Sequence, residues 1–273
     1  MSEQVLSSVR RSRDRLTRLT GGLAQAVGLA VLTLFALSAS AATCQKPVYL
    51  TFDTGGMQSA EWIARLLREH QVKATFFIAN EKTVQGDFVL DDRWSGFWRS
   101  LVRDGHAFGS HTMRHGRILA GDGPSIRYRP QFGQDSGKTV TMTPEAFCQE
   151  LRSVEDRFFE ITQTRFSGLW RAPGGYTTPN AIAAATQCGY RHVGWSPAGF
   201  LGDELPSDRY PNKMLLQKAL RDIRSGDILM AHLGIWSRQE VYAPVLEPLI
   251  VGLKEKGFCF LTIPQHPSYQ MKP

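Results

Sequence analysis

The sequence predicts an α/β fold, namely a distorted (β/α) barrel of about seven parallel strands in a single domain that follows an N-terminal signal or anchor segment. Two observations support this prediction. Short apolar runs alternate with amphipathic stretches, which is typical of β/α units with parallel strands. In addition, polar residues capable of chemistry directly follow several apolar runs, as in barrels whose catalytic groups lie at the carboxyl ends of the strands.

The first 43 residues are predicted to direct export, and residues 44–273 to form the domain. Five arginines between positions 10 and 18 precede an apolar stretch over residues 23–37 and the small-x-small sequence Ala39-Ser40-Ala41, which signal peptidase recognises. An uncleaved membrane anchor is the alternative, because residues 21–42 are nearly long enough to span a bilayer. We therefore expect an exported protein, periplasmic or extracellular, or one anchored to the inner membrane. It would contact a membrane only through this segment, if the segment is uncleaved.

Apolar runs and helical spacings predict the order of the elements. Buried strands are expected at residues 48–52, 74–79, 106–110, 166–171, 190–195, 227–232 and 258–263. A helix with an apolar stripe is expected between the first two strands, and Thr143-Pro144 supplies an N-cap and a first-turn proline for a longer one. A further helix is expected to begin near Pro211. The last helix should end at Gly257, with Pro248 limiting its start or kinking it.

Residues 116–143 form a long polar insertion. A loop longer than about 12–15 residues is usually functional or disordered. The insertion is therefore either a solvated loop or a wall of a substrate cleft.

The charge balance argues against nucleic acid as a partner. The chain has 32 Lys and Arg against 25 Asp and Glu, and residues 1–43 hold five of the former and two of the latter. The mild positive excess that remains would not repel an acidic polysaccharide or a cell wall.

Four cysteines follow the export segment, at positions 44, 148, 188 and 259. An even number in an oxidising compartment suggests disulfide bonds. Cys44 precedes the first strand and Cys259 lies in the last, and these ends would meet in a closed sheet. Cys148 and Cys188 fall on two predicted helices. We therefore predict the pairs 44–259 and 148–188.

The sequence GSHTMRH places His111 and His115 four residues apart. On a helical turn both imidazoles could reach one metal ion, although two surface histidines also fall at this spacing by chance. The placement of other polar residues strengthens the case for a site. Asp53, Arg171 and His232 also lie at the ends of predicted strands, where barrel enzymes place their catalytic groups.

Four segments, in order, resemble motifs of the polysaccharide deacetylase family, also called carbohydrate esterase family 4 or the NodB homology domain. They are TFDTG (51–55), HTMRH (111–115), RAPGG (171–175) and the strand that ends in His232. The resemblance spans roughly residues 47–263. It implies a metal-dependent hydrolase that acts on carbon–nitrogen bonds other than peptide bonds. Its substrate would be an N-acetylated polysaccharide or cell-wall glycan, from which it removes acetyl groups.

The resemblance also implies roles for individual residues. Asp53 matches the general base, Arg171 the arginine beside that base, and His232 the general acid. His111 and His115 match the metal ligands. Zinc is the expected divalent ion, and cobalt, nickel or manganese suit the same ligands.

Three positions depart from the family pattern. Thr54 stands where the family has a metal-binding aspartate, so Asp53 could bind the metal itself, another carboxylate could enter, or the site could be inactive. We expect a retained metal with Asp53 close to it. Gly174 stands where the family commonly has a tyrosine, but it keeps the backbone N–H that is expected to stabilise the oxyanion. Asp203 is the residue expected to orient His232. The alternative function is a catalytically impaired carbohydrate-binding protein with a deacetylase fold, because of Thr54.

Overall fold

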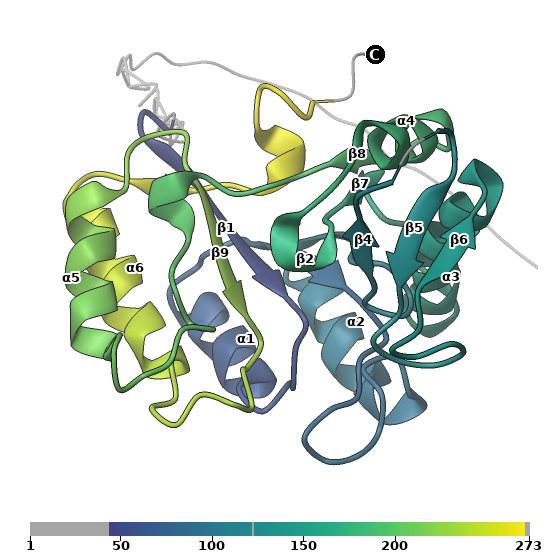
Figure 1. Cartoon of the computed structure of the whole chain (residues 1–273). Coiled ribbons are helices and arrows are strands. Elements are labelled where there is room, and N and C mark those ends of the chain that lie inside the picture. The colour runs from purple at the N-terminus through teal and green to yellow at the C-terminus, as the bar shows by residue number, and fades with distance from the viewer. Residues whose placement is uncertain (1–43, 122, 271–273) are drawn as a thin grey trace, which may run out of the picture. The chain divides into compact units, whose positions relative to one another are not determined.

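The computed structural model describes residues 44–121 and 123–270, and the predicted signal or anchor segment, residues 1–43, lies outside them. Seven strands pair in parallel in one curled sheet (Figure 1). They are β1 (Pro47–Asp53), β2 (Thr75–Ile78), β3 (Ala107–Ser110), β7 (Leu169–Trp170), β8 (Arg191–His192), β9 (Ile228–His232) and β10 (Cys259–Phe260). The strand order is β10-β1-β2-β3-β7-β8, and β9 also pairs with β1.

The chain beyond β8 closes most of the remaining gap in the barrel. The Ser196 N–H donates to the Ile228 carbonyl at 3.1 Å, and the Leu201 N–H donates to the Met230 carbonyl at 3.2 Å. These bonds join the segment after β8 to the free side of β9. The predicted distorted barrel of about seven parallel strands is therefore confirmed.

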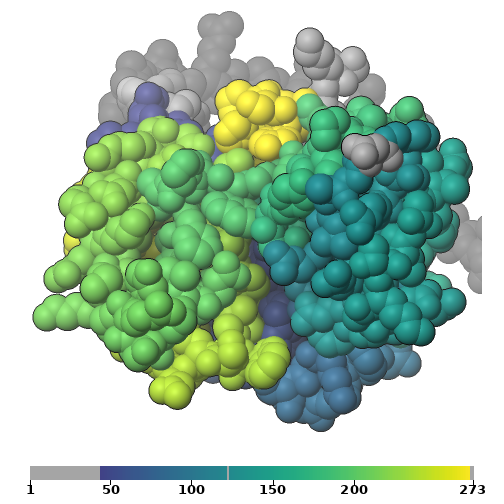
Figure 2. Space-filling model, in the orientation of Figure 1, coloured from purple at the N-terminus to yellow at the C-terminus, as the bar shows by residue number. Residues whose placement is uncertain are grey.

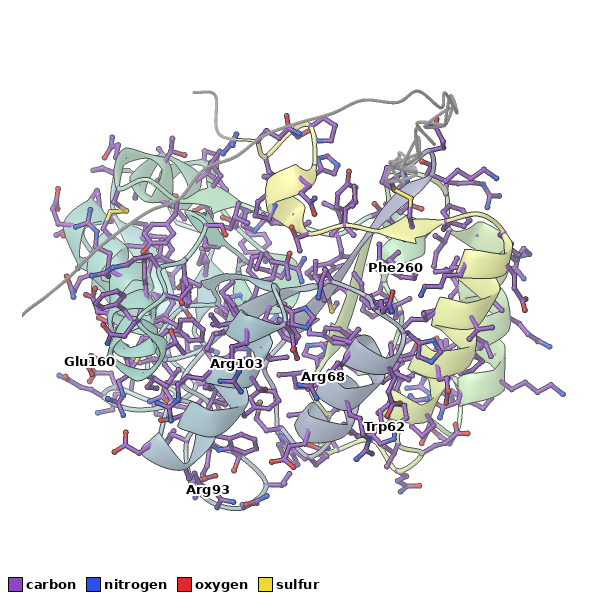
Figure 3. All side chains as sticks on the ribbon, turned by 180° about the vertical axis from the view of Figure 1, so that it is seen from behind. Trp62, Arg68, Arg93, Arg103, Glu160 and Phe260 are labelled. Atoms are coloured by element: carbon purple, nitrogen blue, oxygen red, sulfur yellow. A yellow bond between two sulfur atoms is a disulfide. The ribbon has the colours of Figure 1, made fainter. Side chains whose placement is uncertain are left out.

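Helices cover the outside of the sheet (Figure 1). The α-helices are α1 (Ala60–Glu69), α2 (Ser95–Arg103), α3 (Pro144–Thr162), α4 (Pro179–Gln187), α5 (Asn212–Asp222) and α6 (Leu246–Glu255). Short 3₁₀ turns are η1 (Asp92–Trp94), η2 (Pro173–Gly175), η3 (Pro197–Gly199), η4 (Ala243–Val245) and η5 (Ile263–Gln265). Figure 3 shows the opposite side, where the charged side chains of Arg68 and Glu160 come from helices α1 and α3.

Local sequence signals explain where individual helices begin. The Thr143 hydroxyl accepts a hydrogen bond from the Ala146 N–H at 3.2 Å, so the predicted N-cap of α3 is present. Pro248 lies in the first turn of α6, where a missing N–H removes no helical hydrogen bond. It therefore sits near the start of α6 and does not interrupt the helix.

The residues of β1 alternate between two environments. Val48, Leu50 and Phe52 pack in the large apolar core beneath the helices. Tyr49 belongs to a different buried cluster, and Thr51 shares its face of the strand. The same alternation turns the last residue of β1 toward the inside of the barrel.

The 116–143 insertion is not an open loop. It contains a three-stranded antiparallel sheet of β4 (Arg117–Leu119), β5 (Ile126–Arg129) and β6 (Val140–Met142). Ile126 and Tyr128 are buried while Arg127 and Arg129 are exposed, so β5 follows a two-residue period. The long polar segments between these short strands concealed this pattern in the sequence.

The structure contains both predicted disulfide bonds, Cys44–Cys259 and Cys148–Cys188. The first joins the chain ahead of β1 to β10, and the second joins α3 to the end of α4. Across residues 44–121 and 123–270, no helix combines the length and hydrophobicity needed to cross a bilayer.

Candidate active site

Asp53 ends β1 and forms an ion pair inside the barrel. Its Oδ1 accepts a hydrogen bond from Arg171 Nη1 at 2.8 Å, and both side chains are buried. Burial by itself would raise the pKa of Asp53, but the nearby charge of Arg171, together with the histidines at 111 and 232, lowers it below the usual value. Asp53 is therefore ionised at neutral pH and can accept a proton.

Arg171 is held in place by further contacts, so its charge is fixed beside Asp53. Its Nη1 also donates to the Thr51 hydroxyl at 2.8 Å, and its Nε donates to the Val193 carbonyl at 3.1 Å. Its guanidinium lies 4.2 Å from the centre of the Phe77 ring.

The two histidines of HTMRH lie together, but not on a helix. Residues 111–116 form a turn in which Thr112 and His115 have φ values of 64° and 47°. The expected helical spacing is therefore wrong, yet the ring centroids of His111 and His115 are only 4.9 Å apart. Burial lowers the pKa of His111 to about 4, so this imidazole is neutral at neutral pH and has a lone pair to donate.

His232 ends β9 and is bonded to Asp203. The carboxylate accepts from the His232 Nδ1–H at 3.1 Å and from its backbone N–H at 2.7 Å. Burial by itself would lower the pKa of His232, but the carboxylate of Asp203 raises it to about 9. The imidazole is therefore a cation at neutral pH whose Nε2–H can act as an acid.

These side chains line one cavity of about 240 Å³. Asp53, His111, His115, Gly174, Glu204 and His232 are among its lining residues. Figure 2 shows a hollow between the teal segment that carries the insertion and the green-to-yellow segment that ends the chain. Gly174 lies in the wall at φ 69°, a left-handed conformation in which tyrosine would be strained.

Glu81 and Gln131 were not identified from the sequence. Glu81 is buried three residues after β2, and its Oε1 accepts hydrogen bonds from the Thr54 hydroxyl at 2.5 Å and the Gly55 N–H at 2.8 Å. Burial by itself would raise the pKa of Glu81, but the charge of His115 and the bond from Thr54 lower it. Gln131 Oε1 accepts from His115 Nδ1 at 2.6 Å. The rule that polar residues follow strands could have identified Glu81, whereas no local signal marks Gln131.

Within the described residues, no three histidine, cysteine or carboxylate side chains already converge as a formed metal site. The donors lie in two pairs, with His111 Nε2 3.6 Å from Asp53 Oδ2 and His115 Nδ1 3.7 Å from Glu81 Oε2. Both distances exceed those of hydrogen bonds, so these carboxylate oxygens are not bonded to the rings. Imidazole and carboxylate are ligands that suit a divalent transition ion, so the donor set fits such an ion.

A curled parallel barrel with an ionised carboxylate, a cationic histidine and a histidine pair in one cavity defines a hydrolase-like site. The family model described as polysaccharide deacetylase matches residues 40–193. This match covers more than half of the chain, so the chain belongs to the polysaccharide deacetylase family, whose enzymes hydrolyse carbon–nitrogen bonds other than peptide bonds. The predicted family and enzyme class are thereby confirmed.

Two curated relatives illustrate this family. The peptidoglycan-N-acetylglucosamine deacetylase of Bacillus cereus is 23% identical over 231 residues, which cover 83% of this chain and 90% of the relative. The chitooligosaccharide deacetylase of Azorhizobium caulinodans is 27% identical over 233 residues, which cover 81% of this chain and 94% of the relative.

Solved structures share the fold. The structure of a carbohydrate esterase family 4 pseudoenzyme from Bacillus anthracis superimposes with a TM-score of 0.58 at 19% identity. The match covers 81% of this chain and 65% of that one. At this identity the likeness concerns the fold alone.

Proposed function

We propose that this protein is an exported, metal-dependent hydrolase that removes N-acetyl groups from a glycan. The observation that carries the proposal is the gathering of Asp53, His111, His115 and His232 around one cavity. The names of the relatives, which act on peptidoglycan and chitooligosaccharide, favour an N-acetylated cell-wall glycan or related oligomer as substrate. The two disulfide bonds and the predicted signal segment favour an oxidising compartment outside the cytoplasm.

The metal would be bound by His111 and His115. When bound, a divalent ion, zinc by expectation, polarises a carbonyl and lowers the pKa of a water molecule. Each histidine donates its Nδ1–H to an oxygen, His111 to the Arg171 carbonyl at 2.9 Å and His115 to Gln131. Nε2 of both rings therefore keeps a lone pair for the metal.

The chain's own acid and base complete the reaction. Asp53, held ionised by Arg171, takes a proton from the attacking water. Gly174 lines the cavity, and its backbone N–H would stabilise the oxyanion. His232, held by Asp203, transfers its Nε2 proton to the departing nitrogen, so that the C–N bond breaks and acetate and a free amine are released.

Acetate release from N-acetylglucosamine oligomers tests this function. The purified protein should release acetate, lose this activity with a chelator, and regain it with added zinc. His111→Ala should remove both the metal and the turnover. Turnover that survives His111→Ala would show that the metal site has been assigned to the wrong residues.

A carbohydrate-binding protein without catalysis is the second candidate, because Thr54 occupies the position of a metal-binding aspartate and a family pseudoenzyme shares the fold. Protein that binds the oligomers, holds no metal and releases no acetate would favour this second function.

A further inference from the structure

Glu81 occupies a position in the barrel from which it can reach the histidine pair. It follows β2, and β2 pairs with β1 on one side and with β3 on the other. Thr54 follows β1 and His111 follows β3, so Glu81 comes from the strand between them. Parallel strands bring these three ends to the same edge of the sheet.

The contacts of Glu81 occupy only one of its two oxygens. Oε1 accepts the bonds from Thr54 and Gly55, which fix the orientation of the carboxylate. Thr54 is itself fixed, because its hydroxyl accepts the Ala79 N–H at 3.2 Å. Oε2 makes no hydrogen bond with His115, whose Nδ1 is 3.7 Å away and is bonded to Gln131. Oε2 and Nε2 of His115 can therefore meet at one ion only after the imidazole ring turns.

Glu81 also lacks an ion pair as close as those of the other buried carboxylates. In residues 44–121 and 123–270, the buried carboxylates are Asp53, Glu81, Glu150 and Asp203. Asp53 faces Arg171, Glu150 faces Arg114, and Asp203 faces His232. No lysine or arginine among these residues forms an ion pair with Glu81, and the groups that lower its pKa by their charge are His115 and His111. A buried carboxylate is expected to be paired with a cation or to coordinate a metal.

We propose that Glu81 replaces the carboxylate that family members carry at position 54, so that Glu81, His111 and His115 hold the metal. This inference rests on the proposed function as a metal-dependent hydrolase. Thr54 becomes a positioning residue, since its hydroxyl holds Glu81. Asp53, already paired with Arg171, remains free to act as the base.

Zinc affinity of the full-length, metal-free protein, measured by calorimetry, tests this role without turnover. Glu81→Gln should weaken zinc binding by roughly 100-fold or more. Loss of a residue that only hydrogen-bonds to a metal ligand typically lowers metal affinity about 10–100-fold, and loss of the ligand itself should cost at least as much. The cobalt(II) absorption spectrum should change as well, since a ligand is lost. Glu204→Gln is the matched control. It removes a carboxylate that lines the cavity with His111 and His115, but Glu204 is exposed, so zinc affinity should change less than about fivefold.

A second variant separates ligation from a structural role. The double variant Thr54→Asp/Glu81→Gln returns a carboxylate to position 54 and should recover zinc affinity to within about tenfold of wild type. In chelator, Glu81→Gln should unfold at about the same temperature as wild type, because the glutamine side-chain oxygen can still accept the bonds from Thr54 and Gly55.

Three results would overturn the inference: zinc affinity of Glu81→Gln within fivefold of wild type, an unchanged cobalt spectrum, or a wild-type protein that binds neither ion. Failure of the proposed function looks different. In that case the wild-type protein binds zinc through Glu81 but releases no acetate from N-acetylglucosamine oligomers.

Discussion

Asp53 and Arg171 form a buried ion pair inside the barrel. Arg171 is fully buried and Asp53 is 3% exposed, so water screens neither charge. Removal of one partner of such a pair leaves the other charge buried and uncompensated. The pair therefore matters to stability as well as to the ionisation of Asp53, the proposed base.

Arg171→Leu should lower the free energy of unfolding by about 3–5 kcal/mol, measured by urea denaturation. Adding Asp53→Asn should restore part of this loss, because the uncompensated charge is then removed. Arg65→Leu is the control. It breaks an exposed pair with Glu69, whose side chains are both 62% exposed, and should cost less than about 1 kcal/mol. Fully additive effects of the two buried substitutions would contradict this account.

Under the proposed mechanism, the raised pKa of His232 should set the alkaline limit of activity. With a pKa of about 9, the acid form persists at neutral pH, and turnover should fall as the pH rises through 9. The raised pKa of His232 also stabilises the folded state. This contribution is fully present at pH values below about 6.5, the pKa of histidine in the unfolded chain, and is lost as the pH rises through about 9.

Asp203→Asn should move the alkaline limb of the pH–rate profile to lower pH, because Asp203 makes the largest contribution that raises the pKa of His232. Asparagine keeps one oxygen for the two donors that Asp203 now serves, the Nδ1–H and the backbone N–H of His232, so kcat should fall as well. Glu204→Gln should shift the limb less, since Glu204 contributes less to the pKa. An alkaline limb that stays in place in Asp203→Asn would assign the acid to another group.

At the scale of elements, two segments that are separate in sequence extend the cavity. The insertion contributes Gln131 and Phe132, and the loop after β9 contributes Trp236. Together with residues 82–84 these side chains line a hollow of about 400 Å³, and Gln131 also lines the catalytic cavity. Trp236 is 72% exposed, and an exposed indole beside the proposed glycan site offers a face for a sugar ring.

Trp236→Ala should raise KM for N-acetylglucosamine oligomers by roughly 2–12-fold and leave kcat unchanged, since such contacts contribute about 0.5–1.5 kcal/mol. Met214→Ala is the matched control. Met214 is an exposed apolar side chain on α5 that does not line this hollow, so KM should not change. A fall in kcat with no change in KM would show that Trp236 affects the chemistry and not substrate binding.

At the scale of the whole molecule, the two disulfide bonds constrain the unfolded chain to different extents. Cys44–Cys259 spans 215 residues and Cys148–Cys188 spans 40. Each is expected to stabilise the fold by about 2–5 kcal/mol. In the loop-entropy model, loss of the longer one costs about 1.5 kcal/mol more.

Replacing each cysteine pair by serines and measuring urea denaturation tests this difference. The Cys44→Ser/Cys259→Ser variant should be the less stable of the two. Equal losses would indicate that the ends of the barrel remain together in the unfolded chain without the bond.

Much of the site could be predicted from sequence because its signals are local. Asp53, His111 and His232 directly follow or end apolar strands, and parallel strands bring their ends to one edge of a barrel. The N-cap of α3 and the alternation of strands and helices along the chain likewise depend on short patterns. The insertion was harder to predict, since its strands are only three or four residues long.

The sequence by itself determined the family, the barrel and the residues at the strand ends. Only the tertiary structure decided what surrounds Thr54. Glu81 lies 27 positions away in the sequence, and it meets the Thr54 hydroxyl because β2 pairs directly with β1. Gln131 meets His115 because the insertion folds back as a sheet. Contacts of this kind depend on strand pairing across the barrel, and no periodic pattern in the chain encodes them.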